Sequence, residues 1–154
     1  MALVTPLLLI LMMGTFELGN FFMNEHILVK AVRDGARFAG RLPFSYYDAC
    51  GGEPTSPAGD TRNPMAEIRS LVQTGLLSGG GNKLRNWDAA TITVTTNCTT
   101  MGGTIQGIYR GRATGAPRVT VTASVPYQSV LASFGFTGVG LNLNASQHAA
   151  VMGI

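Results

Sequence analysis

The feature that most constrains this chain is an apolar run at its start that passes, without a break, into a helical pattern. Residues 1–16 read MALVTPLLLILMMGTF, and the apolar character continues to Met23 with Glu17 and Asn20 embedded in it. As a helix, residues 1–16 would span about 24 Å, against about 30 Å for the hydrocarbon core of a bilayer. We therefore expect a few further residues upstream in the precursor.

This run does not have the layout of a secretory signal peptide. No basic residue precedes it, and bulky side chains follow it where a cleavage site needs small residues: Phe16, Leu18, Phe21 and Phe22. We therefore interpret the run as part of the folded protein.

Beyond the run, apolar and small residues recur at spacings of three and four, with charged residues filling the rest of each turn. The apolar set is Phe21, Phe22, Ile27, Leu28, Ala31, Val32, Gly35, Ala36 and Ala39. The pattern predicts one helix from Met1 to Arg41, about 60 Å long. Its first half is apolar on all sides and needs lipid or other helices around it, whereas its second half offers one face to its own domain.

Charge is scarce and unevenly placed. Only 12% of the 154 residues are charged, against roughly 25% in average proteins, and all 11 Lys and Arg lie at Lys30 or beyond. The net charge of +3 produces only a weak electrostatic field around the protein, so we expect no specific nucleic-acid partner. The length fits a single core.

The two cysteines, Cys50 and Cys98, stand in Gly- and Thr-rich stretches without metal-ligand spacing. A disulfide between them is the simplest interpretation, and it would place this part of the chain in an oxidising compartment, the periplasm or the cell exterior. The alternative is two unpaired buried thiols.

The stretch ALVTPLLLILMMGTFELGNFFMNEHILVKAVRDGARFAGR, from Ala2 to Arg41, combines an apolar ALV-P-LLL run, a Phe-Glu-x-Gly step and an A-x-R-x-G-A-R ending. It resembles the TadE-like family. The resemblance implies a pilin-like subunit of tight-adherence (type IVc-like) pili, cleaved by a prepilin peptidase, extracted from the inner membrane and assembled by an ATPase-driven platform. Pilins of this broad group carry an acidic residue just upstream of the apolar run, whereas Met1 already lies within the run.

The basic residues of the helix complicate its orientation. Lys30, Arg33, Arg37 and Arg41 would favour a cytoplasmic C-terminal side by the positive-inside rule. The disulfide and the family resemblance favour the opposite orientation, with residues 42–154 outside the cell, and we follow them.

Residues 42–154 read as an extracellular β-rich domain. A loop over 43–62 precedes a short helix at 64–77, which Asn63 and Pro64 begin and Gly79-Gly80-Gly81 ends. A period of two then predicts strands at 89–97, 104–112 and 118–127, a helical turn at 129–134 and a last strand at 138–152. The expected fold class is α+β and pilin-like: a long N-terminal helix packed on a small antiparallel sheet, with a short second helix.

Glu17 is the most informative polar residue, because a carboxylate within an apolar helix is costly unless it has a partner. It either pairs with a neighbour's N-terminal amine or basic residue and fixes subunit register, or lies at the headgroup level. Asn20 and Asn24 could extend the same polar ladder. The residues expected in the filament core are Leu7, Leu8, Leu11, Phe16, Glu17, Asn20, Phe21 and Phe22.

The charged residues Lys30, Arg33, Asp34 and Arg37 could bridge subunits, or they could form a solvated face of the helix. Neither His26 nor His148 has partners at ligand spacing, and Asp48, Glu53 and Asp60 lack the spacing of a calcium loop. No catalytic motif is present. We expect no enzyme activity, no metal and no cofactor.

These observations predict a structural pilin subunit that polymerises through residues 1–41 into a type IV-like adhesive filament on the cell surface. Its partners would be further copies of itself, the inner membrane before assembly, the prepilin peptidase and the pilus assembly machinery. Two alternatives remain: a minor TadE-type pilin that primes or caps another filament, and a membrane-anchored binding module that does not polymerise.

Overall fold

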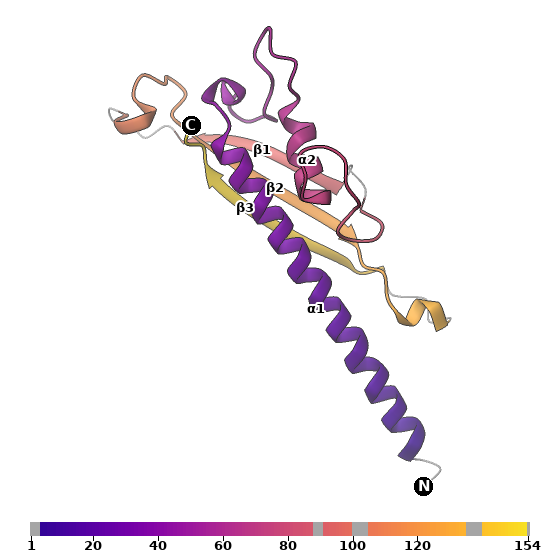
Figure 1. Ribbon diagram of the computed structural model, residues 1–154. Helices are drawn as coiled ribbons and strands as arrows, with labels where there is room; N and C mark the ends of the chain where they lie inside the picture. Colours follow the sequence, from indigo (N-terminus) through magenta and orange to yellow (C-terminus); the bar gives the residue numbers. More distant parts are fainter. Residues whose placement is uncertain (1–3, 88–90, 100–104, 135–139, 154) are drawn as a thin grey trace.

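The computed structural model describes residues 4–87, 91–99, 105–134 and 140–153. Figure 1 shows a long helix, α1 (Val4–Arg41), crossing a small sheet and projecting well beyond it toward the N-terminus. The other elements are η1 (Phe44–Tyr47), α2 (Pro64–Thr74), β1 (Ile92–Thr99), η3 (Gly107–Tyr109), β2 (Ala116–Pro126), η4 (Leu131–Phe134) and β3 (Asn142–Ala150). The α+β pilin-like fold predicted from the sequence is confirmed.

The helix α1 is continuous over its described length, so Pro6, Gly14 and Gly19 do not interrupt it. At 1.5 Å per residue it is about 57 Å long. The fully buried residues of α1 lie in its C-terminal half and are small and branched residues on one face: Leu28, Ala31, Val32, Gly35, Ala36, Ala39 and Gly40. The helical periodicity read from the sequence therefore identified the face that packs on the domain.

The sheet has the order β1-β2-β3 and both pairings are antiparallel. Its buried face carries the alternating apolar residues of each strand, with Ile92 and Val94 on β1, Val119 and Val121 on β2, and Leu143 on β3. The helix α1 packs against β3, β2 and α2. The opposite face of the sheet presents the Thr, Ser and Asn side chains that alternate with the core residues.

One predicted strand is wrong. Of the expected strand 104–112, residue 104 lies outside the described residues, and the rest forms the short helix η3 and a turn. Gly107 and Gly111 adopt positive φ angles, which a strand does not accommodate. Both edges of β2 are already occupied by β1 and β3, so this segment has no place beside the central strand.

The helix α2 begins as predicted and ends earlier than predicted. The side chain of Asn63 accepts a hydrogen bond from Ala66 N at 3.0 Å, with Pro64 in the first helical position. The helix stops at Thr74 because Gly75 adopts a left-handed conformation with φ 86°. The prediction that it runs to residue 77 and is ended by the later glycines is wrong.

The other boundaries differ by a few residues from those predicted. The strand β2 starts two residues before 118 and ends one before 127, and the strand β3 is shorter than 138–152 at both ends. The strand β1 extends to Thr99, past the predicted end at 97. The beginnings of the predicted first and last strands, at 89–90 and 138–139, lie outside the described residues.

Close packing between α1 and α2 depends on Gly35. A Cβ atom at this position would overlap with Val72 Cγ2, so we expect Gly35→Leu to lower the free energy of unfolding by about 2 to 3 kcal/mol. Gly14→Leu is the matched control, because nothing lies within 4 Å of a Cβ built at Gly14. Thermal unfolding of both variants in detergent would test this, and equal melting temperatures would contradict the packing described.

Candidate functional site

Among the described residues, most of the exposed large apolar side chains lie on the N-terminal half of α1. Eleven large apolar side chains on it are between 53% and 70% exposed: Val4, Leu7, Leu8, Leu9, Ile10, Leu11, Met12, Phe16, Leu18, Phe22 and Met23. Consecutive members such as residues 7–10 point to all sides of the helix, since each residue turns the helix by about 100°. The segment is long and apolar enough to cross a membrane, and none of the apolar window is buried within the chain.

Phe21 differs from the other apolar residues predicted in the filament core because it packs on its own domain. Its ring meets the ring of Tyr127 edge-on, with 5.2 Å between centroids. Tyr127 follows directly after β2, so this contact joins α1 to the connection between β2 and β3.

Glu17 accepts hydrogen bonds from the same connection, with both carboxylate oxygens in use. The hydroxyl of Tyr127 donates to Oε1 at 2.8 Å. The backbone amides of Val130 and Leu131 donate to Oε2 at 3.1 and 3.2 Å. The partner of this carboxylate in the single subunit is therefore a loop more than a hundred residues away in sequence.

Two asparagines continue this polar group along α1. Asn20 Nδ2 donates to the hydroxyl of Tyr127 at 2.9 Å, and Asn24 Nδ2 donates to the carbonyl of Asn20 at 2.9 Å. Burial, together with the hydrogen bond to Glu17, raises the pKa of Tyr127, so its hydroxyl stays protonated and able to donate. Side-chain hydrogen bonds thus link Glu17, Tyr127 and Asn20, while Asn24 bonds to the backbone of α1. Tyr127 is the member of this group that sequence reasoning missed.

The basic residues of α1 form an exposed stripe. Lys30, Arg33, Arg37 and Arg41 are all exposed, whereas Asp34 is half-buried. The spacing of three, four and four places the four cations on one side of the helix. Within the described part of the chain, the ion pairs involve other residues: Arg62 with Glu67, Arg69 with Glu53, and Arg112 with Asp48. The stripe is therefore available to a neighbouring molecule or to water.

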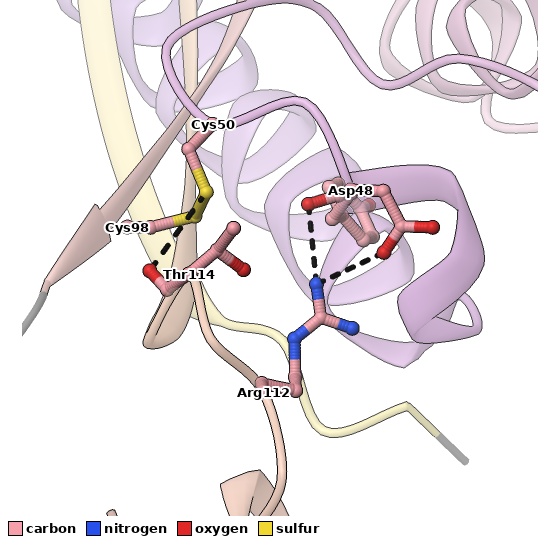
Figure 2. Close-up of a disulfide and its surroundings, with 6 residues drawn as sticks. Asp48, Cys50, Cys98, Arg112 and Thr114 are labelled. Atoms are coloured by element: carbon pink, nitrogen blue, oxygen red, sulfur yellow. Dashed lines mark hydrogen bonds and ion pairs between the residues drawn. A yellow bond between two sulfur atoms is a disulfide. The ribbon is translucent and has the colours of Figure 1, made fainter.

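Cys50 and Cys98 form a disulfide with a Cα–Cα distance of 5.5 Å (Figure 2). Beside it, Gly51 N donates to Thr96 O at 2.7 Å and Thr96 N donates to Gly52 O at 2.8 Å. The disulfide and this short backbone pairing hold the loop after α1 against the outer edge of β1.

Arg112 supports the same loop and was not singled out from the sequence. Figure 2 shows its guanidinium directed at Asp48, and Nη2 donates to Asp48 Oδ1 at 3.2 Å and to Tyr47 O at 3.3 Å. The guanidinium also lies over the ring of Phe44, 4.9 Å from its centroid. An arginine in a Gly-rich turn gives no sequence signal for these contacts.

The remaining polar candidates lie apart from one another. In the described residues, no three His, Cys, Asp or Glu side chains gather as a metal-binding group would. Asp48 pairs with Arg112 and Glu53 with Arg69, while Asp60 accepts hydrogen bonds from the hydroxyl of Tyr46 and from Arg62 N. Each carboxylate thus has a separate structural partner.

An α+β domain carried on a helix whose N-terminal half is apolar and uncovered is a pilin-like fold. The family model described as "TadE-like protein" matches residues 1–37. This match confirms the resemblance predicted from the sequence, to a family of pilus-associated structural proteins. No curated protein and no solved structure matches the chain.

Proposed function

We propose that this chain is a structural pilin subunit that polymerises through α1 into an extracellular type IV-like filament used for adhesion. Residues 1–41 serve as membrane anchor before assembly and as filament core afterwards, and residues 42–154 form the outer domain. The observation that carries the proposal is the uncovered apolar half of α1.

The apolar half of α1 cannot remain in water. Covering one large apolar side chain is worth about 1.5 to 3 kcal/mol, so the exposed set together favours a covered state by more than ten kcal/mol, even after allowing for partial exposure. Lipid and neighbouring helices both provide that cover. Since lipid tails are as apolar as leucine, the transfer from membrane to filament depends on helix packing and on the assembly machinery rather than on hydrophobicity.

Two glycines support packing between helices of neighbouring subunits. Gly14 and Gly19 lie on the uncovered half of α1, and apart from chain neighbours and the nearby backbone of the helix nothing lies within 4 Å of a Cβ built at either position. Small residues on apolar helices allow the backbones of adjacent helices to approach closely. In the proposed filament, the helices that pack on this surface belong to further copies of the same chain.

The proposal also gives a location and an order of events. The precursor lies in the inner membrane, a prepilin peptidase processes it, and the pilus machinery moves it into the filament on the cell surface. The exposed stripe Lys30, Arg33, Arg37 and Arg41, with Asp34 beside it, supplies charges for contacts between subunits.

We expect Glu17→Ala to leave membrane insertion intact and to abolish filaments. The substitution removes the acceptor of the Val130 and Leu131 amides, and a hydrogen bond to a charged group is worth about 1.5 to 3 kcal/mol. The β2–β3 connection then no longer holds a fixed position on α1, and the domain loses its orientation relative to the helix that must pack. Sheared filaments and membrane fractions, both detected by immunoblot, would measure the two effects.

Ile108→Ala is the control for this variant. Ile108 is exposed in the outer domain, so its truncation removes no packed contact within the subunit and leaves α1 unchanged. A filament yield from Glu17→Ala equal to that of the control would contradict a role for Glu17 in assembly.

A further inference from the structure

Next to the uncovered half of α1, the domain forms an open cavity of about 700 Å³. One wall is α1 at Asn20 and Asn24, and the other walls are residues 125–132 and the loop at 83–85. The connection between β2 and β3 lies at the end of the domain from which the apolar half of α1 projects (Figure 1). In a membrane-anchored precursor, this end of the domain lies nearest the bilayer surface.

The cavity is basic. Its charged lining residues are Lys83 and Arg85, and no carboxylate is among the residues that line it. Both cations are exposed, and neither takes part in an ion pair with any of the described residues. Of the two glutamates of α1 near this level, Glu17 already accepts three hydrogen bonds from the β2–β3 connection. Glu25, next to Asn24, is not among the residues that line the cavity.

The loop that carries the two cations is firmly held. Leu84 and Trp87 are buried in the core on either side of Arg85. Lys83 N donates to Gln73 O at 2.8 Å, and Asn82 Nδ2 donates to Trp87 O at 3.2 Å. Lys83 and Arg85 line the cavity from this fixed loop. The ammonium of Lys83 also lies beside Gly75 at the end of α2, 3.2 Å from where a Cβ at Gly75 would be.

The level of the cavity along α1 matches the headgroup layer. Asn20 and Asn24, the two residues of α1 that line the cavity, are about 6 Å apart along the helix, and the polar layer on each side of a bilayer is about 5 to 8 Å thick. Across this interval the cavity side of α1 carries Asn20 and Asn24, whereas Phe22 and Met23 are exposed and apolar. Val130, also exposed, lies at the level of Glu17 through its amide hydrogen bond. An apolar tip with polar and basic groups above it is the arrangement of an interfacial membrane contact.

We propose that this cavity binds the phosphate of an anionic phospholipid and that Val130 enters the bilayer surface, so that the precursor domain rests on the membrane in one orientation. The inference rests on the membrane-anchored precursor of the proposed function. Lys83 and Arg85 provide the positive charge that attracts the phosphate. The side-chain amides of Asn20 and Asn24 line the same cavity as further polar groups. Assembly into a filament would release the lipid.

The test uses the full oxidised chain in vesicles of phosphatidylcholine, alone or mixed with phosphatidylglycerol. An environment-sensitive dye on Val130→Cys reports whether the loop tip enters the bilayer. We expect a blue-shifted emission in the anionic vesicles and a water-like emission in the neutral ones. Lys83→Gln with Arg85→Gln should lower the ratio of docked to undocked protein by roughly thirtyfold. Each Lys or Arg near an anionic surface favours the docked state by a factor of about five to six, and two such factors multiply.

Arg33→Gln with Arg37→Gln is the matched control. It removes the same charge from exposed positions that lie about 24 Å and 30 Å along α1 from Glu17, and it should keep the blue shift. A dye on Ile108→Cys, another exposed apolar position, should give a water-like emission in both kinds of vesicle.

Three outcomes would overturn the inference. They are a water-like emission from residue 130 in anionic vesicles, an equal blue shift in both kinds of vesicle, or a blue shift that depends on protein density instead of lipid charge. The last result would mean that a second copy of the chain covers the cavity. Carbonate extraction of the same vesicles tests the anchor separately, so a chain that stays in the membrane without docking its domain refutes this inference alone.

Discussion

Replacing Cys50 and Cys98 by serine is expected to lower the free energy of unfolding by about 4 kcal/mol. The two cysteines are 48 residues apart in sequence, and closing a loop of that length removes chain entropy from the unfolded state by about this amount. The loss is a large share of the 5 to 15 kcal/mol that stabilises an ordinary domain. Chemical denaturation of both proteins in detergent, followed by circular dichroism, would measure it.

The reduced wild-type protein is the internal control for this prediction. Reductant should shift the unfolding midpoint of the wild type to that of the serine variant and leave the variant unchanged. If the oxidised wild type and the serine variant unfold at the same denaturant concentration, the disulfide contributes nothing to the stability of the domain.

We expect Leu11→Asp to abolish filaments while leaving the domain folded. Leu11 is 59% exposed on the uncovered half of α1, so the domain does not depend on it. A charged residue near the centre of a membrane helix costs about 3 kcal/mol or more relative to leucine. That cost corresponds to a reduction of about a hundredfold or more in correctly anchored subunits. Burying the same charge in an apolar filament core has a similar free-energy cost.

Ile108→Asp is the matched control, because Ile108 has nearly the same exposure, 60%, and lies in the outer domain. Its filament yield should equal that of the wild type. Equal yields from both variants would contradict the assignment of α1 as the anchor and filament core.

The helices were predictable from local sequence because their signals are local. The apolar and small residues of α1 repeat at helical spacing, and Leu28, Ala31 and Val32 lie in the core as that spacing requires. The N-terminus of α2 followed from Asn63 and Pro64, a capping residue and a proline in the first turn.

The errors arose where a choice between local structures depends on the rest of the fold. The alternation around Ile108 satisfies a strand pattern, but the central strand had no free edge for it. Gly75 ended α2 before the more conspicuous glycine triplet. In each case the sequence allowed the predicted element, and a neighbouring contact or a single backbone conformation excluded it.

The site was only partly predictable for a related reason. Glu17 stood out as a carboxylate in an apolar helix, but its partners Tyr127, Val130 and Leu131 are more than a hundred residues away, and two of them donate through backbone amides. Backbone donors leave no trace in side-chain identity. The same holds for Arg112, whose contacts with Asp48 and Tyr47 depend on how two loops meet.

Electron microscopy combined with mass spectrometry of filaments sheared from the producing cells tests the central claim most directly. The account predicts filaments in which this chain is the dominant mass, with α1 of neighbouring subunits packed in the core and the sheet domains outside. Filaments built mainly of another protein would make this chain a minor pilin. The presence of the chain in membranes without any filament would contradict the proposed polymer and favour an anchored binding module.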